Sequence, residues 1–163
     1  MGSMDSIETE IYDALQLIPA MAKAEGWLSD AKWTVAVKKA LVSVGRKLGH
    51  GTAASGCESD EGAEWLYDVV WWKSDSEGDM TDVPLVAESE WGGEKAIKDD
   101  FKKLLVARSK YRVMVFQGKS EIVVKDRFEK MRRWVEKFKG ILPTDRFLLV
   151  GWAQDHWVFD HIP

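Results

Sequence analysis

The sequence is poor in the residues that build disulfides and soft-ligand metal sites. It has one cysteine, Cys57, and three histidines among 163 residues. A single cysteine excludes an internal disulfide and a cysteine-rich zinc site, and it is typical of a reducing compartment. With so few histidines, a histidine-based metal site is disfavoured as well. If this chain holds a metal ion, we expect carboxylates to be its ligands.

The sequence also lacks long apolar segments. No stretch approaches about 20 uninterrupted apolar residues, so we expect no membrane span and no membrane partner. The first residues do not combine a basic stretch with an apolar run, so they do not resemble a secretory signal. These absences predict a cytoplasmic protein. Its length of 163 residues with 45% apolar content predicts a single domain over residues 1–163, in which residues 1–3 are typical of a cloning remnant.

Acidic and basic residues are unevenly distributed along the chain, although the net charge is only −4. Residues 1–94 hold 18 Asp and Glu against 7 Lys and Arg, whereas residues 95–139 hold 15 Lys and Arg against 6 Asp and Glu. A local basic region can bind a polyanion in a protein that is acidic overall. The alternative is that basic helices simply present solvated faces.

Hydrophobic periodicity predicts an alternation of helices and strands. Apolar residues spaced three and four apart indicate helices, and strict alternation indicates strands. The expected helices span 6–23, 29–48, 94–109 and 125–139, and the expected strands 64–72, 83–91, 111–116, 146–152 and 157–162, with a short strand near 52–54. We therefore expect an α/β fold, a central mixed sheet flanked by helices.

Three acidic residues stand within apolar strand segments. Glu88 and Glu90 lie two residues apart in VPLVAESEW and so share one face of a strand, and Asp68 lies in LYDVVW. If the two strands are neighbours, three carboxylates converge, which is unfavourable unless a cation compensates or one stays protonated. Oxygen ligands favour magnesium or manganese. The alternative is a solvent-facing strand side, where acids are ordinary.

This arrangement resembles the PD-(D/E)XK nuclease superfamily, which has the restriction-endonuclease-like fold. The matching segments are YDVVW with Asp68, VAESEW with Glu88 to Glu90, DDFKKLL from Asp99 and RVMVF from Arg112, within residues 29–117. The resemblance implies a core of this fold with added N-terminal helices and a C-terminal helix plus strand pair. It also implies a magnesium- or manganese-dependent phosphodiesterase acting on DNA or RNA, in which Asp68 and Glu88 hold the metal.

The chain departs from the superfamily pattern at Glu90, where lysine is usual. A carboxylate there cannot supply positive charge to a phosphate, so either the lysine has moved to the following helix or activity is lost. The candidates on that helix are Lys98, Lys102 and Lys103, of which we favour Lys103. We thus expect Asp68, Glu88, Glu90 and Lys103 to form the catalytic set.

The resemblance leaves two functional interpretations open. In one, the protein is a nuclease whose basic side chains contact the phosphate backbone: Lys98, Lys102, Arg127, Lys130 and Arg133. In the other, it is a catalytically inactive module of the same fold that binds or regulates a partner. In either case a homodimer or a protein partner could supply specificity.

Overall fold

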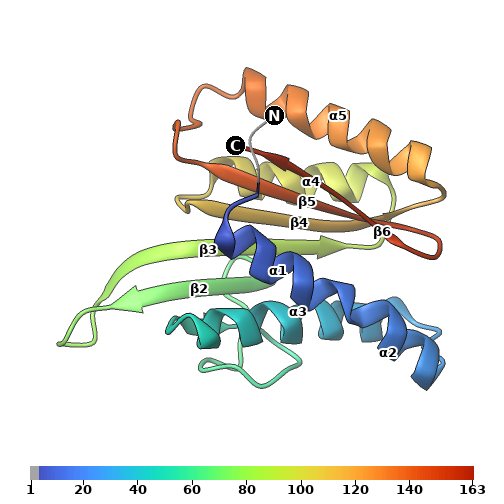
Figure 1. Cartoon of the computed structure of the whole chain (residues 1–163). Coiled ribbons are helices and arrows are strands. Elements are labelled where there is room, and N and C mark those ends of the chain that lie inside the picture. The colour runs from blue at the N-terminus through green and yellow to red at the C-terminus, as the bar shows by residue number, and fades with distance from the viewer. Residues whose placement is uncertain (1–3) are drawn as a thin grey trace. The chain divides into compact units, whose positions relative to one another are not determined.

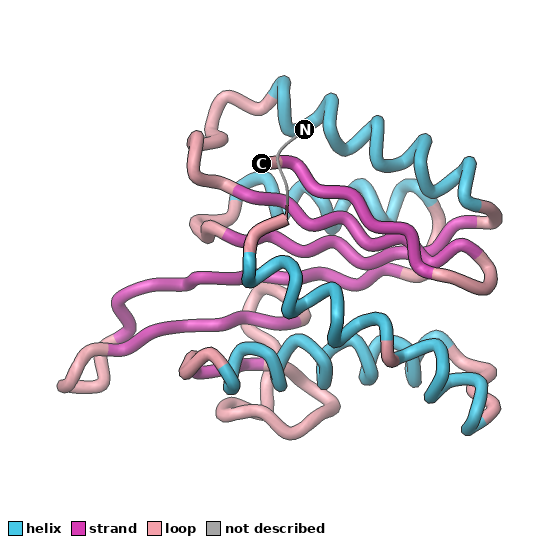
Figure 2. The backbone as a smooth tube through the Cα atoms, in the orientation of Figure 1, coloured by secondary structure: helices cyan, strands magenta, loops and turns pink. Residues whose placement is uncertain are grey.

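The computed structural model describes residues 4–163, so the expected cloning remnant at 1–3 lies outside the described residues. The chain is an α/β protein with a mixed β-sheet, as predicted (Figures 1 and 2). The strand order is β1-β2-β3-β4-β5-β6. It divides into two compact units, Met1–Leu85 and Val86–Pro163. The division falls within β3 (Met80–Glu90), and the units are described in turn. A single domain over 1–163 stays a prediction from the sequence.

The first unit opens with three helices, α1 (Ser6–Gln16), α2 (Ile18–Glu25) and α3 (Asp30–Lys47). A capping box starts α1, because Asp5 accepts from the backbone N–H of Glu8 while the Glu8 side chain accepts from that of Asp5. The Ile18-Pro19 pair begins α2, since proline is tolerated in a first turn. Helix α2 ends at Gly26, whose φ of 62° lies in the left-handed region that glycine adopts readily.

Two strands of the first unit pack closely against α3. Strands β1 (Gly51–Ala53) and β2 (Val69–Ser74) pair antiparallel. Trp71 is fully buried, and its indole N–H donates to the Leu41 carbonyl at 3.0 Å. A Cβ at Gly45 would lie 2.6 Å from the Trp71 Nε1 atom, so this position on α3 has no room for a side chain. The close approach fixes α3 against β2.

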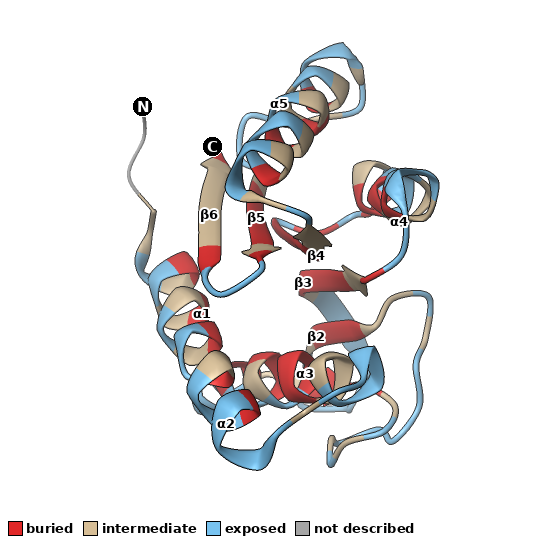
Figure 3. Cartoon of the chain, turned by 90° about the vertical axis from the view of Figure 1, so that its right-hand side faces the viewer, coloured by how far each residue is buried: buried red, intermediate tan, exposed pale blue. Residues whose placement is uncertain are grey.

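The second unit holds the end of β3 followed by α4 (Glu94–Val106), β4 (Tyr111–Gly118), α5 (Glu121–Lys137), β5 (Arg146–Ala153) and β6 (Trp157–Ile162). Strands β4 and β5 are parallel, and α5 provides the crossover that such a pair requires. Strand β6 returns antiparallel to β5. Buried residues fill β4, β5 and one side of α5 (Figure 3). In this core, Phe101 of α4 contacts Phe147 of β5.

A buried ion pair links the start of β4 to the loop before β5. Arg112 and Asp145 are 3% and 5% exposed, and their Nη1 and Oδ2 atoms lie 2.8 Å apart. The Arg112 guanidinium also donates from Nη2 to the Ala107 carbonyl at 2.8 Å. Asp145 accepts from the backbone N–H of Leu142 at 2.9 Å. Both charges are therefore compensated within the core.

The element order agrees with the prediction except that the helix expected over 6–23 is two helices, α1 and α2. The expected strand over 64–72 was wrong at its start. Strand β2 begins only at Val69, so Asp68 precedes the strand instead of lying in it. The alternation of polar and apolar residues over 64–68 does not reflect a sheet, because Glu64 and Asp68 turn to the same lysine, Lys38. Helix α5 starts four residues earlier than expected, where the Ser120 hydroxyl caps it.

Among residues 4–163, no helix has both the length and the apolar content needed to cross a bilayer.

Candidate functional site

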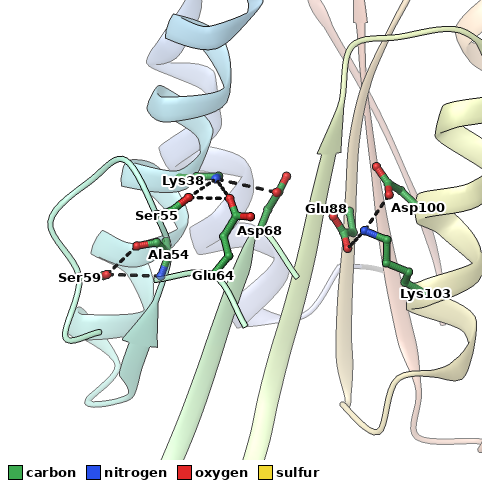
Figure 4. Close-up of polar contacts among 9 residues, drawn as sticks. All are labelled: Lys38, Ala54, Ser55, Ser59, Glu64, Asp68, Glu88, Asp100 and Lys103. Atoms are coloured by element: carbon green, nitrogen blue, oxygen red, sulfur yellow. Dashed lines mark hydrogen bonds and ion pairs between the residues drawn. The ribbon is translucent and has the colours of Figure 1, made fainter. Parts of the chain in front are cut away.

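In the second unit, Glu88 and Lys103 form an ion pair between β3 and α4 (Figure 4). The Lys103 ammonium donates to Glu88 Oε1 at 2.8 Å and lies 2.8 Å from Asp100 Oδ1. Asp100 and Lys103 share one face of α4 because residues three apart on a helix are neighbours. Glu88 is only 3% exposed, since the apolar strand around it is buried. The unit thus holds an ammonium between two carboxylates.

The charge of Lys103 is stabilised by these two carboxylates. Burial alone would lower the pKa of Lys103, but the hydrogen bonds and charges of Asp100 and Glu88 outweigh it and raise the pKa well above its ordinary value. The side chain is therefore an ammonium throughout the physiological pH range. It cannot accept a proton as a general base there, and its chemical use is as a fixed positive charge.

Glu90 points its carboxylate into the turn that follows β3. Its Oε1 atom accepts from the backbone N–H of Gly92 at 2.6 Å. A Cβ at Gly92 would lie 2.8 Å from the same oxygen, so a larger residue here would require the Glu90 carboxylate to shift. Glu88 and Glu90 lie two residues apart and so share one side of the strand. Glu88 nevertheless pairs with a lysine, whereas Glu90 accepts from a main-chain amide. Catalysis by Glu90 stays a prediction.

In the first unit, Asp68 belongs to a second cluster that the sequence analysis missed (Figure 4). Lys38 on α3 is 5% exposed, and its ammonium lies 3.2 Å from Ser55 Oγ and 3.8 Å from Asp68 Oδ1. It also pairs with Glu64. The signal in the sequence was its position: Lys38 stands three and four residues before Leu41 and Val42, on the apolar face of α3, where an unpaired lysine is unfavourable.

The five side chains expected to bind nucleic acid lie in different surroundings within the second unit. Lys98 lies over the Trp134 ring at 5.3 Å, and Lys102 pairs with Asp99 at 2.8 Å. Lys130 pairs with Glu94 and Asp126, and Arg127 donates to the Gln117 carbonyl. Arg133 is exposed. Acidic partners thus offset the charge of Lys102 and Lys130, and all five roles in binding stay predictions.

Comparisons with protein-family models, with curated proteins and with solved structures found no match. The resemblance to the PD-(D/E)XK superfamily therefore stays a prediction from the sequence.

The donors around Glu88 are chemically suited to a hard cation. Over residues 4–163, no three His, Cys, Asp or Glu side chains gather as a group that could hold a metal ion. The candidate ligand atoms are carboxylate oxygens, which magnesium and manganese prefer. Carboxylate chemistry is compatible with magnesium or manganese, and Glu88 as a ligand of either stays a prediction.

Proposed function

We propose that this protein is a magnesium- or manganese-dependent phosphodiesterase that cleaves nucleic acid. The observation that carries the proposal is the 2.8 Å ion pair between the buried Glu88 and Lys103. It joins Glu88, an acid of the sequence pattern, to Lys103. We favoured Lys103 as the replacement for the usual lysine, whose position Glu90 occupies. The order of β3, α4 and β4 also agrees with the order that the resemblance implies.

In this proposal each residue has a distinct role. Glu88 would hold the metal, and Asp68 stays its second ligand on the sequence prediction alone. The bound metal would polarise the phosphate and lower the pKa of an attacking water. Lys103 would place its ammonium against the charge that develops on the phosphate oxygens. Asp100 would position Lys103, because it holds the ammonium on the same helix face.

One observation favours the second interpretation, an inactive module that binds or regulates a partner. The Glu90 carboxylate, which stands where lysine is usual, accepts from the Gly92 amide and so has a structural role in the turn. A chain that had lost activity would be free to use this position in that way. The two interpretations differ in whether metal produces cleavage.

We expect the wild-type protein to cleave DNA or RNA in the presence of Mg²⁺ or Mn²⁺ and to be inactive with a chelator. Lys103→Met is expected to lower the rate about 10²- to 10³-fold, the effect typical of removing one preorganised charge or donor from a transition state. The measurement is the rate of cleavage of labelled single-stranded and duplex DNA and RNA, with circular dichroism to verify folding.

The matched control is Lys95→Met, because Lys95 lies on the same helix and also pairs with an aspartate, Asp99, but is almost fully exposed. It should retain the wild-type rate. Failure of the wild type to cleave any of the four substrates with either metal would contradict the phosphodiesterase proposal and favour the inactive module. Retained activity in Asp68→Asn would remove Asp68 alone from the proposed site.

The proposal also includes the partner and the location that the sequence predicts. We propose a nucleic acid, DNA or RNA, as the substrate, and a homodimer or a protein partner as the source of specificity. We also propose a cytoplasmic location, where a reduced Cys57 and a supply of magnesium are expected.

A further inference from the structure

The helices of the first unit enclose a cavity that the proposed function does not use. Helices α1 and α2 both pack against α3 (Figure 1). Between them lies a half-open cavity of about 600 Å³. This volume falls within the range of about 300–1,000 Å³ that is usual for small-molecule sites. It is large enough for a flexible organic molecule.

The walls of this cavity are mainly apolar. Its lining includes Leu17, Ile18, Met21, Val35, Ala36 and Ala40. Leu17 and Met21 are 65% and 44% exposed, so apolar surface remains open to solvent at the cavity. Covering that surface with an apolar ligand would contribute about 25 cal/mol for each Å² removed from water. Methionine adapts its shape readily, which suits a flexible chain.

The lining carries a net positive charge, because two lysines, Lys32 and Lys39, outnumber its one acid, Glu25. Lys32 and Lys39 line the cavity from α3, and neither ammonium has a carboxylate within ion-pair distance in the described part of the chain. The acid on the lining, Glu25, accepts from the Trp27 indole at 2.7 Å. An anionic headgroup would therefore find two unpaired cations beside an apolar cavity.

We propose that this cavity binds a small amphipathic carboxylate, a molecule with one apolar chain and one anionic headgroup. The chain would lie against the apolar walls of α1, α2 and α3, and the headgroup would pair with Lys32 and Lys39. An amphipathic helix is a less suitable occupant. Such a partner needs an interface above about 1,000 Å², whereas the two lysines and the enclosed volume match a single small molecule.

The test is titration calorimetry of the full chain with sodium dodecanoate below its micelle-forming concentration. We expect one molecule to bind per chain, and dodecyltrimethylammonium, which has the same chain and the opposite charge, to bind at least tenfold more weakly. Lys39→Gln and Lys32→Gln should each weaken dodecanoate binding about threefold to fivefold, the effect of one solvent-exposed ion pair. Lys23→Gln is the matched control, an exposed lysine on α2 outside the lining, and should bind as the wild type does.

Ala40→Phe tests the cavity itself, because a ring at this lining position would occupy the space of the ligand's chain. We expect it to abolish binding while circular dichroism shows a folded protein. If it unfolds, the two exposed lysine variants still decide the proposal. No binding of dodecanoate, equal binding of the cationic detergent, or binding of a helical peptide in place of dodecanoate would each overturn it. None of these results bears on nucleic-acid cleavage, so the two proposals fail separately.

Discussion

Glu88→Gln is expected to abolish metal-dependent cleavage, with a rate at least about 10³-fold below that of the wild type. A metal that stabilises charge in a transition state contributes several kcal/mol, and each 1.4 kcal/mol corresponds to a factor of ten. The amide has nearly the same shape as the carboxylate but lacks its charge, so it is a poor ligand for a hard cation. The measurement is the single-turnover rate of cleavage at saturating Mn²⁺.

The same variant should remain folded, since the amide oxygen can still accept from Lys103 and that lysine keeps its contact with Asp100. Glu136→Gln, an exposed glutamate on α5, is the matched control and should cleave at the wild-type rate. A rate for Glu88→Gln within tenfold of the wild type, with a normal circular dichroism spectrum, would show that Glu88 does not hold the metal.

Asp145→Ala is expected to lower the free energy of unfolding by about 3–5 kcal/mol, because it leaves the Arg112 charge buried without its partner. The variant also removes the bond that the Leu142 amide donates to this carboxylate. Urea denaturation followed by tryptophan fluorescence measures the change. Lys125→Ala breaks an exposed pair with Glu121 and should cost less than about 1 kcal/mol.

The double variant Arg112→Met/Asp145→Leu separates the buried charge from the packing of the side chains. Both charges are then absent, so it should recover at least half of the stability that Asp145→Ala loses. If Asp145→Ala costs less than about 1 kcal/mol, or if the double variant is no more stable than the single one, the pair does not act as a compensated buried charge.

The element order was predictable because hydrophobic periodicity follows from burial. Beyond Arg112, strand β4 is apolar on both faces as far as Phe116 and is buried there, as a strand covered on both sides must be. Periodicity could not separate residues 64–68 from β2, because Glu64 and Asp68 alternate with apolar side chains yet turn toward Lys38. A local pattern does not reveal a partner 26 residues away in the sequence.

The candidate site was partly predictable for the same reason. Glu88 stood out because an acid within an apolar strand needs a compensating charge, and the structure supplies that charge from Lys103. Lys98 borders the apolar stripe of α4, so helical geometry alone would favour it over Lys103 as the partner of Glu88. In the structure, however, Lys98 lies over the Trp134 ring, which belongs to another helix. The choice between these lysines depends on which elements pack against α4. The sequence of α4 alone does not contain that information.

The central claim, that Glu88 binds a divalent metal, is tested most directly by a crystal structure determined in Mn²⁺ with anomalous scattering data. We predict an anomalous peak within about 2.0–2.6 Å of a Glu88 carboxylate oxygen, the range for oxygen ligands of hard cations. A fully occupied Mn²⁺ elsewhere on the protein, with Glu88 still in its ion pair with Lys103, would contradict the account.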